Sequence, residues 1–313
     1  MEGIKTTPEW LIRFGLDHFS PSQLTSPLCV WLFKYILLNQ KERRVLPVGS
    51  KAHGGNGAAL SLTHLLSQNI KECSFVLVDD AEKQIIMPPK EVRDALAAGM
   101  KVLHRNLGWN EKEQEQRFAN QKSLPGVVNN ALAALKPLLE KGKNKTVFCE
   151  EYVSLQLKDV QVPIIGRLDY RRDQNFYELK TKWRKRGKVK KDGTRSFYQV
   201  KCPEENDLGF SPHINHVKQV AVYWKATGYK PHLVYASDVD FKVFHEGNCE
   251  HLKPKFLEEM LQEVRASAIA RQNIIKKSST AQEAAMLVQP QWDSFYWDMP
   301  VEWLSRAKDL WRY

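Results

Sequence analysis

Two carboxylates and a lysine lie close together in the middle of the chain. Asp169 ends the segment IIGRLD, and Glu178 and Lys180 follow in FYELK, after a turn through Asp173 and Asn175. Because side chains alternate between the two faces of a strand, Glu178 and Lys180 project from the same face. A hairpin between the two segments places Asp169 beside them.

Such a group suits the hydrolysis of phosphodiester bonds. Carboxylate oxygens are hard ligands for Mg²⁺ or Mn²⁺, and a bound ion activates water and stabilises charge on a phosphate. Lys180 can orient that water or neutralise the developing charge. A surface hairpin with an ordinary Glu-x-Lys has the same spacing and is common, so the surrounding residues decide between the two interpretations.

Further polar residues could complete this site. Gln219 and Tyr223 are four residues apart, so on a helix they share one face and could hold a phosphate or a base. Tyr223 could equally be a core residue. Glu151, at the start of the first expected strand, could contact a metal-bound water or be an ordinary solvated glutamate.

The segment after Lys180 is strongly basic. Residues 182–201 contain nine Lys or Arg and one acidic residue. A solvated basic loop is one interpretation, but the position beside a phosphodiester-cleaving centre favours contact with DNA. Trp183, Phe197 and Tyr198 could stack on unpaired bases. The DNA-binding candidates of the segment are Lys182, Arg184, Lys185, Arg186 and Lys188.

The periodicity of the chain predicts the elements that hold these residues. Ser20-Pro21 and Ser26-Pro27 indicate two short helices, and the glycine-rich residues 49–57 indicate a tight turn before a helix over 58–68. A helical run over 127–139 is followed by three expected strands, a helix and another strand. The expected ranges are strands 147–157, 162–171 and 175–182, helix 214–227, strands 232–237 and 240–245, and helix 254–276.

The motifs and their order resemble the RecB-type, exonuclease-like PD-(D/E)XK nuclease superfamily. The matching motifs are G-x-x-D ending at Asp169, E-x-K at Glu178, and Gln219-x-x-x-Tyr223. Upstream, residues 19–24 with Cys29 resemble the N-terminal helix motif, and Gly49-x-x-x-His53 resembles the G-x-x-x-H element of these nucleases.

The resemblance implies an α/β (α+β) fold with a restriction-endonuclease-like core, in which helices flank a central mixed sheet. It also implies that Asp169, Glu178, the Leu179 carbonyl and His53 are metal ligands and that Lys180 is the catalytic lysine. Without the resemblance, His53 is more simply a capping or core histidine. We expect a mainly helical region over 1–126, the nuclease core over 127–250, and C-terminal helices packed on the core over 251–313.

Composition narrows the partners and the surroundings. Forty-seven Lys and Arg against thirty-six Asp and Glu give a net charge of +11, which favours a polyanion such as nucleic acid. Five widely spaced cysteines without a CxxC pair indicate neither a disulfide framework nor a zinc ribbon. The trio of cysteines found in iron–sulfur members of the family is missing, so we expect no cluster and a buried thiol at Cys29. No membrane-spanning or signal segment is indicated, so we expect a soluble intracellular protein of the cytoplasm, nucleoid or organelle interior.

Together these features predict a Mg²⁺- or Mn²⁺-dependent DNA exonuclease that acts in recombination, repair or replication. A structure-specific or restriction-like endonuclease could use the same core. A non-catalytic basic subunit that only binds nucleic acid is the alternative from another class, and RNA is an alternative substrate. The expected partner is single-stranded or end-bearing DNA, and a helicase or a single-strand-binding protein follows by analogy. No membrane partner is expected.

Overall fold

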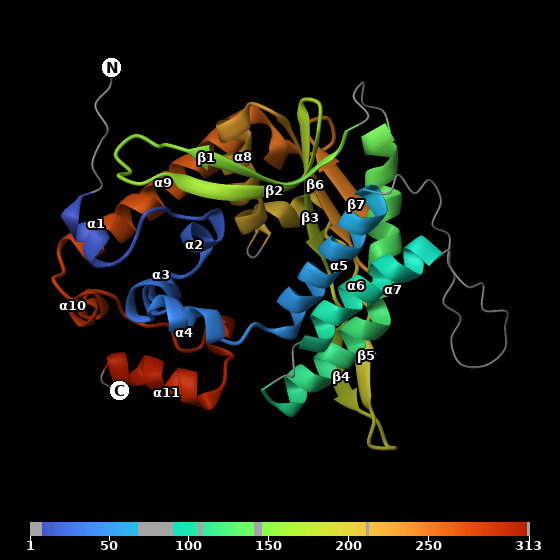
Figure 1. Cartoon of the computed structure of the whole chain (residues 1–313), viewed down its shortest axis with the longest axis horizontal. Coiled ribbons are helices and arrows are strands. Elements are labelled where there is room, and N and C mark those ends of the chain that lie inside the picture. The colour runs from blue at the N-terminus through green and yellow to red at the C-terminus, as the bar shows by residue number, and fades with distance from the viewer. Residues whose placement is uncertain (1–7, 68–89, 106–108, 141–145, 211–212, 312–313) are drawn as a thin grey trace.

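A five-stranded mixed sheet lies at the centre of the molecule (Figure 1). The computed structural model describes residues 8–67, 90–105, 109–140, 146–210 and 213–311. The parallel pair is β3 with β6, and the other neighbours are antiparallel. The predicted mixed α/β fold class is therefore confirmed. In sheet order the strands are β1 (Phe148–Leu155), β2 (Ile164–Arg172), β3 (Asn175–Thr181), β6 (Lys230–Ala236) and β7 (Phe241–His245).

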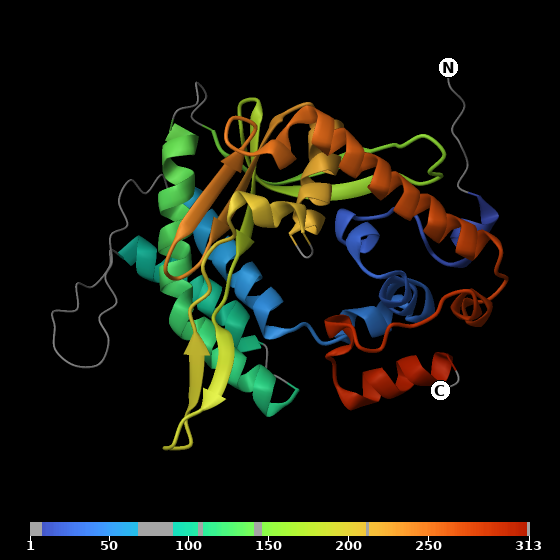
Figure 2. The same ribbon diagram turned by 180° about the vertical axis from the view of Figure 1, so that it is seen from behind.

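Helices cover both faces of the sheet. One face packs against α5 (Ser50–Ser67) and α7 (Glu111–Glu140), and α6 (Lys90–Arg105) packs on these two helices. The other packs against α8 (Ile214–Thr227) and α9 (Pro254–Lys276), as Figure 2 shows from behind. Strand β3 contributes to both cores, because Phe176 packs on the α8 side while Tyr177 and Leu179 pack on the α7 side. This alternation turns Glu178 and Lys180 towards α8.

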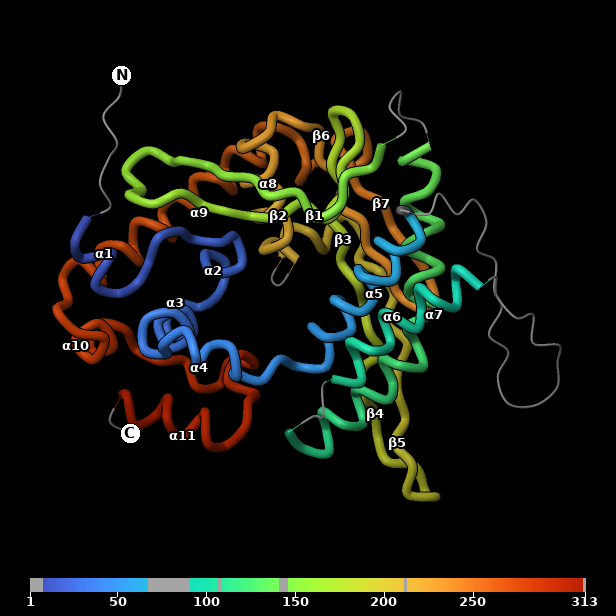
Figure 3. Tube along the Cα trace, viewed as in Figure 1, coloured from blue at the N-terminus to red at the C-terminus, as the bar shows by residue number. Residues whose placement is uncertain are grey.

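Short helices at the two ends of the chain pack together beside the α8 face. They are α1 (Glu9–Arg13), α2 (Pro21–Thr25), α3 (Leu28–Trp31), the π-helical turn η1 (Leu32–Leu37), α4 (Gln40–Val45), α10 (Ala281–Met286), η4 (Phe295–Trp297) and α11 (Val301–Leu310). Ser20 caps α2 as predicted, accepting a hydrogen bond from the Gln23 backbone. Trp297 contacts Phe33, so the C-terminal segment packs against the N-terminal helices, and Figure 3 shows the two ends of the chain side by side.

The glycine-rich segment is helical rather than a turn. Helix α5 begins at Ser50, eight residues before the predicted start. Its glycines serve close packing: a Cβ on Gly54 would lie 2.6 Å from the Trp183 ring, and one on Gly57 would lie 2.4 Å from Leu103 of α6. Packing against these neighbours outweighs the low helix propensity of glycine, which costs roughly 1 kcal/mol per residue.

The basic segment also contains regular structure. Strands β4 (Lys185–Val189) and β5 (Arg195–Tyr198) form a two-stranded antiparallel ribbon, with Lys185 opposite Tyr198. The ribbon projects away from the central sheet (Figure 1). Its turn contains Gly193 at φ +82°, a left-handed conformation that glycine adopts without strain.

The expected boundary between residues 126 and 127 lies inside the continuous helix α7. The 3-10 turns η2 (Glu205–Gly209) and η3 (Glu250–Leu252) precede α8 and α9, respectively. Among the described helices, none is both long enough and apolar enough to cross a membrane.

Candidate active site

A cavity of about 830 Å³ opens between the sheet and the helices around it. Its walls come from β1, β2, β3, α8, α5 and the start of α2. Asp169, Glu178, Lys180, Gln219 and Tyr223 all line it. The residues that the sequence predicted as an active centre are therefore brought together around one space.

The separation of β2 from β3 creates this space. Their backbone pairing ends at Tyr170 opposite Tyr177. In the same register Asp169 would face Glu178, but the strands diverge there. The Leu179 backbone N–H therefore has no backbone acceptor in β2. It donates instead to the Asp169 carboxylate over 2.8 Å. This bond fixes the carboxylate at the edge of the opening.

A chain of hydrogen bonds holds the lysine in place. Lys180 Nζ donates to Glu178 Oε1 and to Gln219 Oε1, each over 2.7 Å. Gln219 Nε2 in turn donates to the Tyr223 hydroxyl over 2.8 Å. The predicted pairing of Gln219 with Tyr223 on one helix face is thus observed, and its contact is with Lys180.

The glycine of the G-x-x-D motif makes room for this chain. A Cβ on Gly166 would lie 2.3 Å from Cε1 of the Tyr223 ring, far closer than an ordinary contact of about 3.5–4.0 Å. Tyr223 is 2% exposed and packs edge-on against Phe176, so its ring has little room to move. Gly166 and Tyr223 fit as a pair.

The two carboxylates carry more negative charge than their surroundings balance. Burial, followed by the repulsion of Glu178, raises the pKa of Asp169 well above its ordinary value. Burial also raises the pKa of Glu178, while Lys180 opposes this effect. Glu178 Oε2 is buried and has no hydrogen-bond partner among the described residues. A buried acceptor without a partner costs roughly 1–3 kcal/mol, and a divalent cation would satisfy it.

A third carboxylate is Glu150, which the sequence analysis missed in favour of Glu151. Glu150 lines the cavity and pairs with Arg167, whereas Glu151 pairs with Arg171. The β1–β2 register aligns Glu150 with Asp169, but Glu150 has φ +60° and leaves the regular pairing. That backbone conformation is rare outside glycine, and no feature of the sequence signals it.

His53 lies next to the cavity but is not one of the residues that line it. It belongs to α5, whose Ala52, Gly55 and Asn56 line the cavity, but its own side chain does not. Each residue along a helix is turned by about 100° from the one before it, so His53 faces another direction. Burial lowers the pKa of His53 and the nearby Glu113 opposes this effect. His53 Nδ1 is buried and has no hydrogen-bond partner among the described residues, so a ligand role for His53 stays a prediction.

His216 is a cavity residue that the sequence analysis missed. Its Nδ1 lies 2.7 Å from the Tyr235 hydroxyl, and its pKa is lowered well below the ordinary value by burial and then by Lys180 and Lys182. It precedes Gln219 by three residues on α8, and this helical spacing was the signal that could have found it.

The five basic DNA-binding candidates differ in their surroundings. Arg184 forms an ion pair with Asp238, and Arg186 with Glu115, so both fasten the ribbon to the body. Lys185 and Lys188 are exposed and have no ion-pair partner within the described ranges. Lys182 lies 2.6 Å from the ring nitrogen Nε2 of His213.

The three aromatic candidates for base stacking differ in how far they are exposed. Trp183 is 5% exposed and donates from Nε1 to Thr181 Oγ1, so it is a core residue and the prediction that it stacks on bases is wrong. Phe197 is half-buried. Tyr198 is 53% exposed and stays a candidate for stacking.

Comparison with known proteins adds little. No family model matches the chain, and no curated protein sequence does. The crystal structure of SSO0001 is similar over 66% of this chain and 83% of that chain, with 15% sequence identity and a TM-score of 0.26. At that TM-score the two backbones differ too widely for the likeness to bear on the site.

Proposed function

We propose that this protein is a Mg²⁺- or Mn²⁺-dependent nuclease that hydrolyses phosphodiester bonds in DNA. The observation that carries the proposal is the buried, unsatisfied Glu178 Oε2 beside Asp169 and Lys180 in one cavity. Buried carboxylates without enough compensating charge are costly unless a cation joins them. The oxygen-only donor set matches the ligand preference of Mg²⁺.

Asp169 and Glu178 would hold the ion, with the Leu179 carbonyl as a further ligand and Glu150 beside them. A bound ion supplies an activated water and stabilises negative charge on the phosphate. Glu178 has one oxygen committed to Lys180 and the other free. The same carboxylate can therefore serve both the ion and the lysine.

Lys180 stabilises charge on the reacting phosphate. Its side chain is 19% exposed, and its ammonium group is positioned by Glu178 on one side and Gln219 on the other. The third ammonium hydrogen stays available to a phosphate oxygen or to the attacking water. Tyr223 fixes the Gln219 amide so that its oxygen, rather than its NH₂ group, faces the lysine.

Lysines near the cavity supply the phosphate-binding surface. Lys51 lines the cavity, and the repulsion of Lys185 lowers the pKa of Lys51 after the larger effect of burial. Lys182 is affected in the same way by Lys185 and Lys51. A nucleic-acid backbone would relieve this repulsion between like charges. Tyr198, exposed on the ribbon, offers a surface for an unpaired base.

The proposed substrate is a DNA end or a single strand, and the proposed setting is recombination, repair or replication inside the cell. A helicase or single-strand-binding protein would supply such ends. The preference for ends rests on the resemblance to exonuclease-like families. An endonuclease that uses the same residues is distinguished by cleavage of covalently closed circular DNA.

The deciding experiment is digestion of 5′- and 3′-labelled single- and double-stranded DNA with Mg²⁺, with Mn²⁺ and with EDTA. We expect cleavage with either ion, none with EDTA, and a loss of many orders of magnitude in Lys180→Ala and Asp169→Asn. DNA binding in both variants should stay close to wild type. Binding without cleavage in the wild-type protein would instead support the non-catalytic subunit, and cleavage of RNA alone would reassign the substrate.

A further inference from the structure

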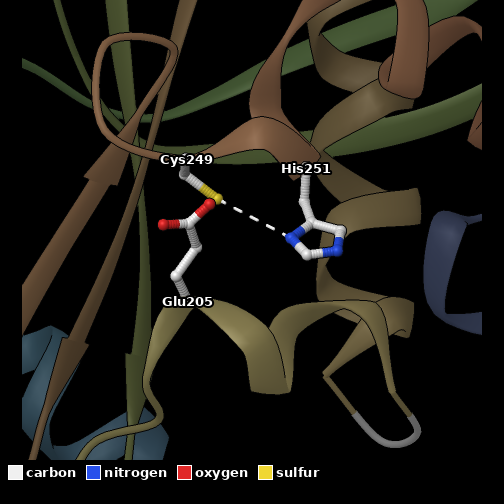
Figure 4. A group of neighbouring side chains, drawn as sticks. All are labelled: Glu205, Cys249 and His251. Carbon is white, nitrogen blue, oxygen red and sulfur yellow. Dashed lines mark hydrogen bonds between the residues drawn. The ribbon is translucent and has the colours of Figure 1, made fainter.

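A second group of side chains with metal-binding chemistry lies outside the cavity. Glu205 comes from η2, and Cys249 and His251 come from the segment around η3 (Figure 4). One donor atom from each lies within 4.8 Å of the other two. Cys249 Sγ is 4.0 Å from His251 Nδ1, and Figure 4 shows the Glu205 carboxylate directed at the same sulfur.

We propose that Glu205, Cys249 and His251 bind a Zn²⁺ ion. Thiolate, imidazole and carboxylate are the ligands that zinc uses in proteins, at roughly 2.0–2.3 Å. Tetrahedral geometry at those bond lengths separates sulfur from nitrogen by about 3.6 Å. The observed 4.0 Å requires a movement of only a few tenths of an ångström. The fourth position is left to water.

The surroundings hold two of the ligands in position. Glu205 Oε1 accepts a hydrogen bond of 3.1 Å from the Glu250 backbone N–H, which leaves Oε2 for an ion. The His251 ring meets the edge of Phe256, with centroids 4.7 Å apart. It also packs on Gly209, where a Cβ would lie 2.6 Å from His251 Nε2. A side chain at position 209 would push the ring away.

The sulfur belongs to a residue that is almost completely shielded from solvent. Cys249 is 2% exposed. A bound cation would stabilise the thiolate form that this burial disfavours. A cysteine–histidine pair could also act as a nucleophile, but a sulfur this buried has no room for an attacked carbonyl. On binding, the thiol proton leaves to solvent as the sulfur–zinc bond forms.

Zinc at this position would join two parts of the chain that are distant in sequence. It would tie η2, just before α8, to η3, just before α9. Helix α8 carries Gln219, so the ion would help to fix the helix that lines the cavity. The inference is independent of the proposed nuclease activity, because its ligands lie outside that cavity.

The test is a Co²⁺ titration of the full-length, metal-free protein, followed by Zn²⁺. We expect a sulfur-to-cobalt charge-transfer band that saturates at one equivalent and disappears as Zn²⁺ displaces Co²⁺. Only a thiolate ligand gives this band, so an ion among the carboxylates of the cavity does not contribute. Zn²⁺ should also raise the melting temperature.

Variants show which residues are responsible. Cys249→Ser should remove the band. Glu205→Gln keeps an oxygen for the Glu250 N–H and should weaken zinc affinity by at least about tenfold, which tests the site without loss of the fold. The half-buried Cys149 is the matched control, because Cys149→Ser should keep the band, as should Asp169→Asn. Absence of the band in the wild-type protein, or its persistence in Cys249→Ser, would overturn the proposal.

Discussion

Gly166→Ala probes the fit between β2 and α8 without changing a charged residue. The added methyl group would lie 2.3 Å from Cε1 of Tyr223, so the ring must retreat by more than about 1 Å to reach an ordinary contact. Tyr223 is buried and its hydroxyl holds Gln219, which holds Lys180. The displacement therefore reaches the lysine through two hydrogen bonds.

Two magnitudes follow from this geometry. Overpacking of a buried site costs about 1–3 kcal/mol, which for a chain of this length corresponds to roughly 2–10 °C in melting temperature. A shift of about 1 Å in a positioning residue can lower the rate by about 100-fold. We therefore expect kcat/KM on labelled DNA with Mg²⁺ to fall by one to two orders of magnitude, while salt-dependent DNA binding stays close to wild type.

A double-mutant cycle separates this cause from general damage. In a Tyr223→Leu background the ring is gone, so Gly166→Ala should add little further loss of activity or stability, and the coupling energy should exceed about 0.5 kcal/mol. Wild-type kcat/KM in the single variant, or losses that simply add in the double variant, would refute the proposed link from Gly166 to Lys180.

Three further outcomes are expected. Glu150→Gln should lower kcat/KM by about 10- to 100-fold because Glu150 lines the cavity. Glu151→Gln should stay near wild type because Glu151 does not line the cavity and pairs with Arg171. Equal effects of the two variants would contradict the assignment. Replacing both Lys185 and Lys188 by Ala should lower the slope of log affinity against log salt by about 2, and an unchanged slope would remove them from the DNA-binding surface. Burial and then His245 lower the pKa of His232 to about 4, so the contribution of the neutral ring to stability is complete above pH 6.5 and declines as the pH falls towards 4. The free energy of unfolding measured with urea should therefore fall by about 2 kcal/mol between pH 6.5 and 5, and His232→Gln should lack this loss. Equal losses in both proteins would contradict the prediction.

The parts of the fold that sequence could predict are those set by local periodicity. Alternation along residues 175–181 placed Glu178 and Lys180 on one face, and the structure confirms this. The helical spacing of Gln219 and Tyr223 placed them together on α8, which is also observed. Ser20 was recognisable as a cap because Pro21 follows it at the first helical position, and the structure shows its side chain accepting a hydrogen bond from the Gln23 backbone.

The rest depended on contacts that no local pattern contains. Glu150 was missed because the register between the first two strands was unknown: it is Glu150, and not Glu151, that aligns with Asp169, and Glu150 lines the cavity together with Tyr152, two residues further along the strand. The glycines of α5 were interpreted as a turn because their partners, Trp183 and Leu103, are distant in sequence. Trp183 was expected to be exposed for the same reason.

The separation of β2 from β3 links the fold to the chemistry. If the ladder continued past Tyr170 and Tyr177, the Leu179 N–H would bond to a backbone carbonyl and the Asp169 carboxylate would have to find another place. Because the strands diverge, that N–H holds the carboxylate at the rim, and the space between the strands becomes part of the cavity. The lost backbone pairing and the uncompensated carboxylates both lower stability. A cation bound in the space between the strands would offset the cost of the carboxylates.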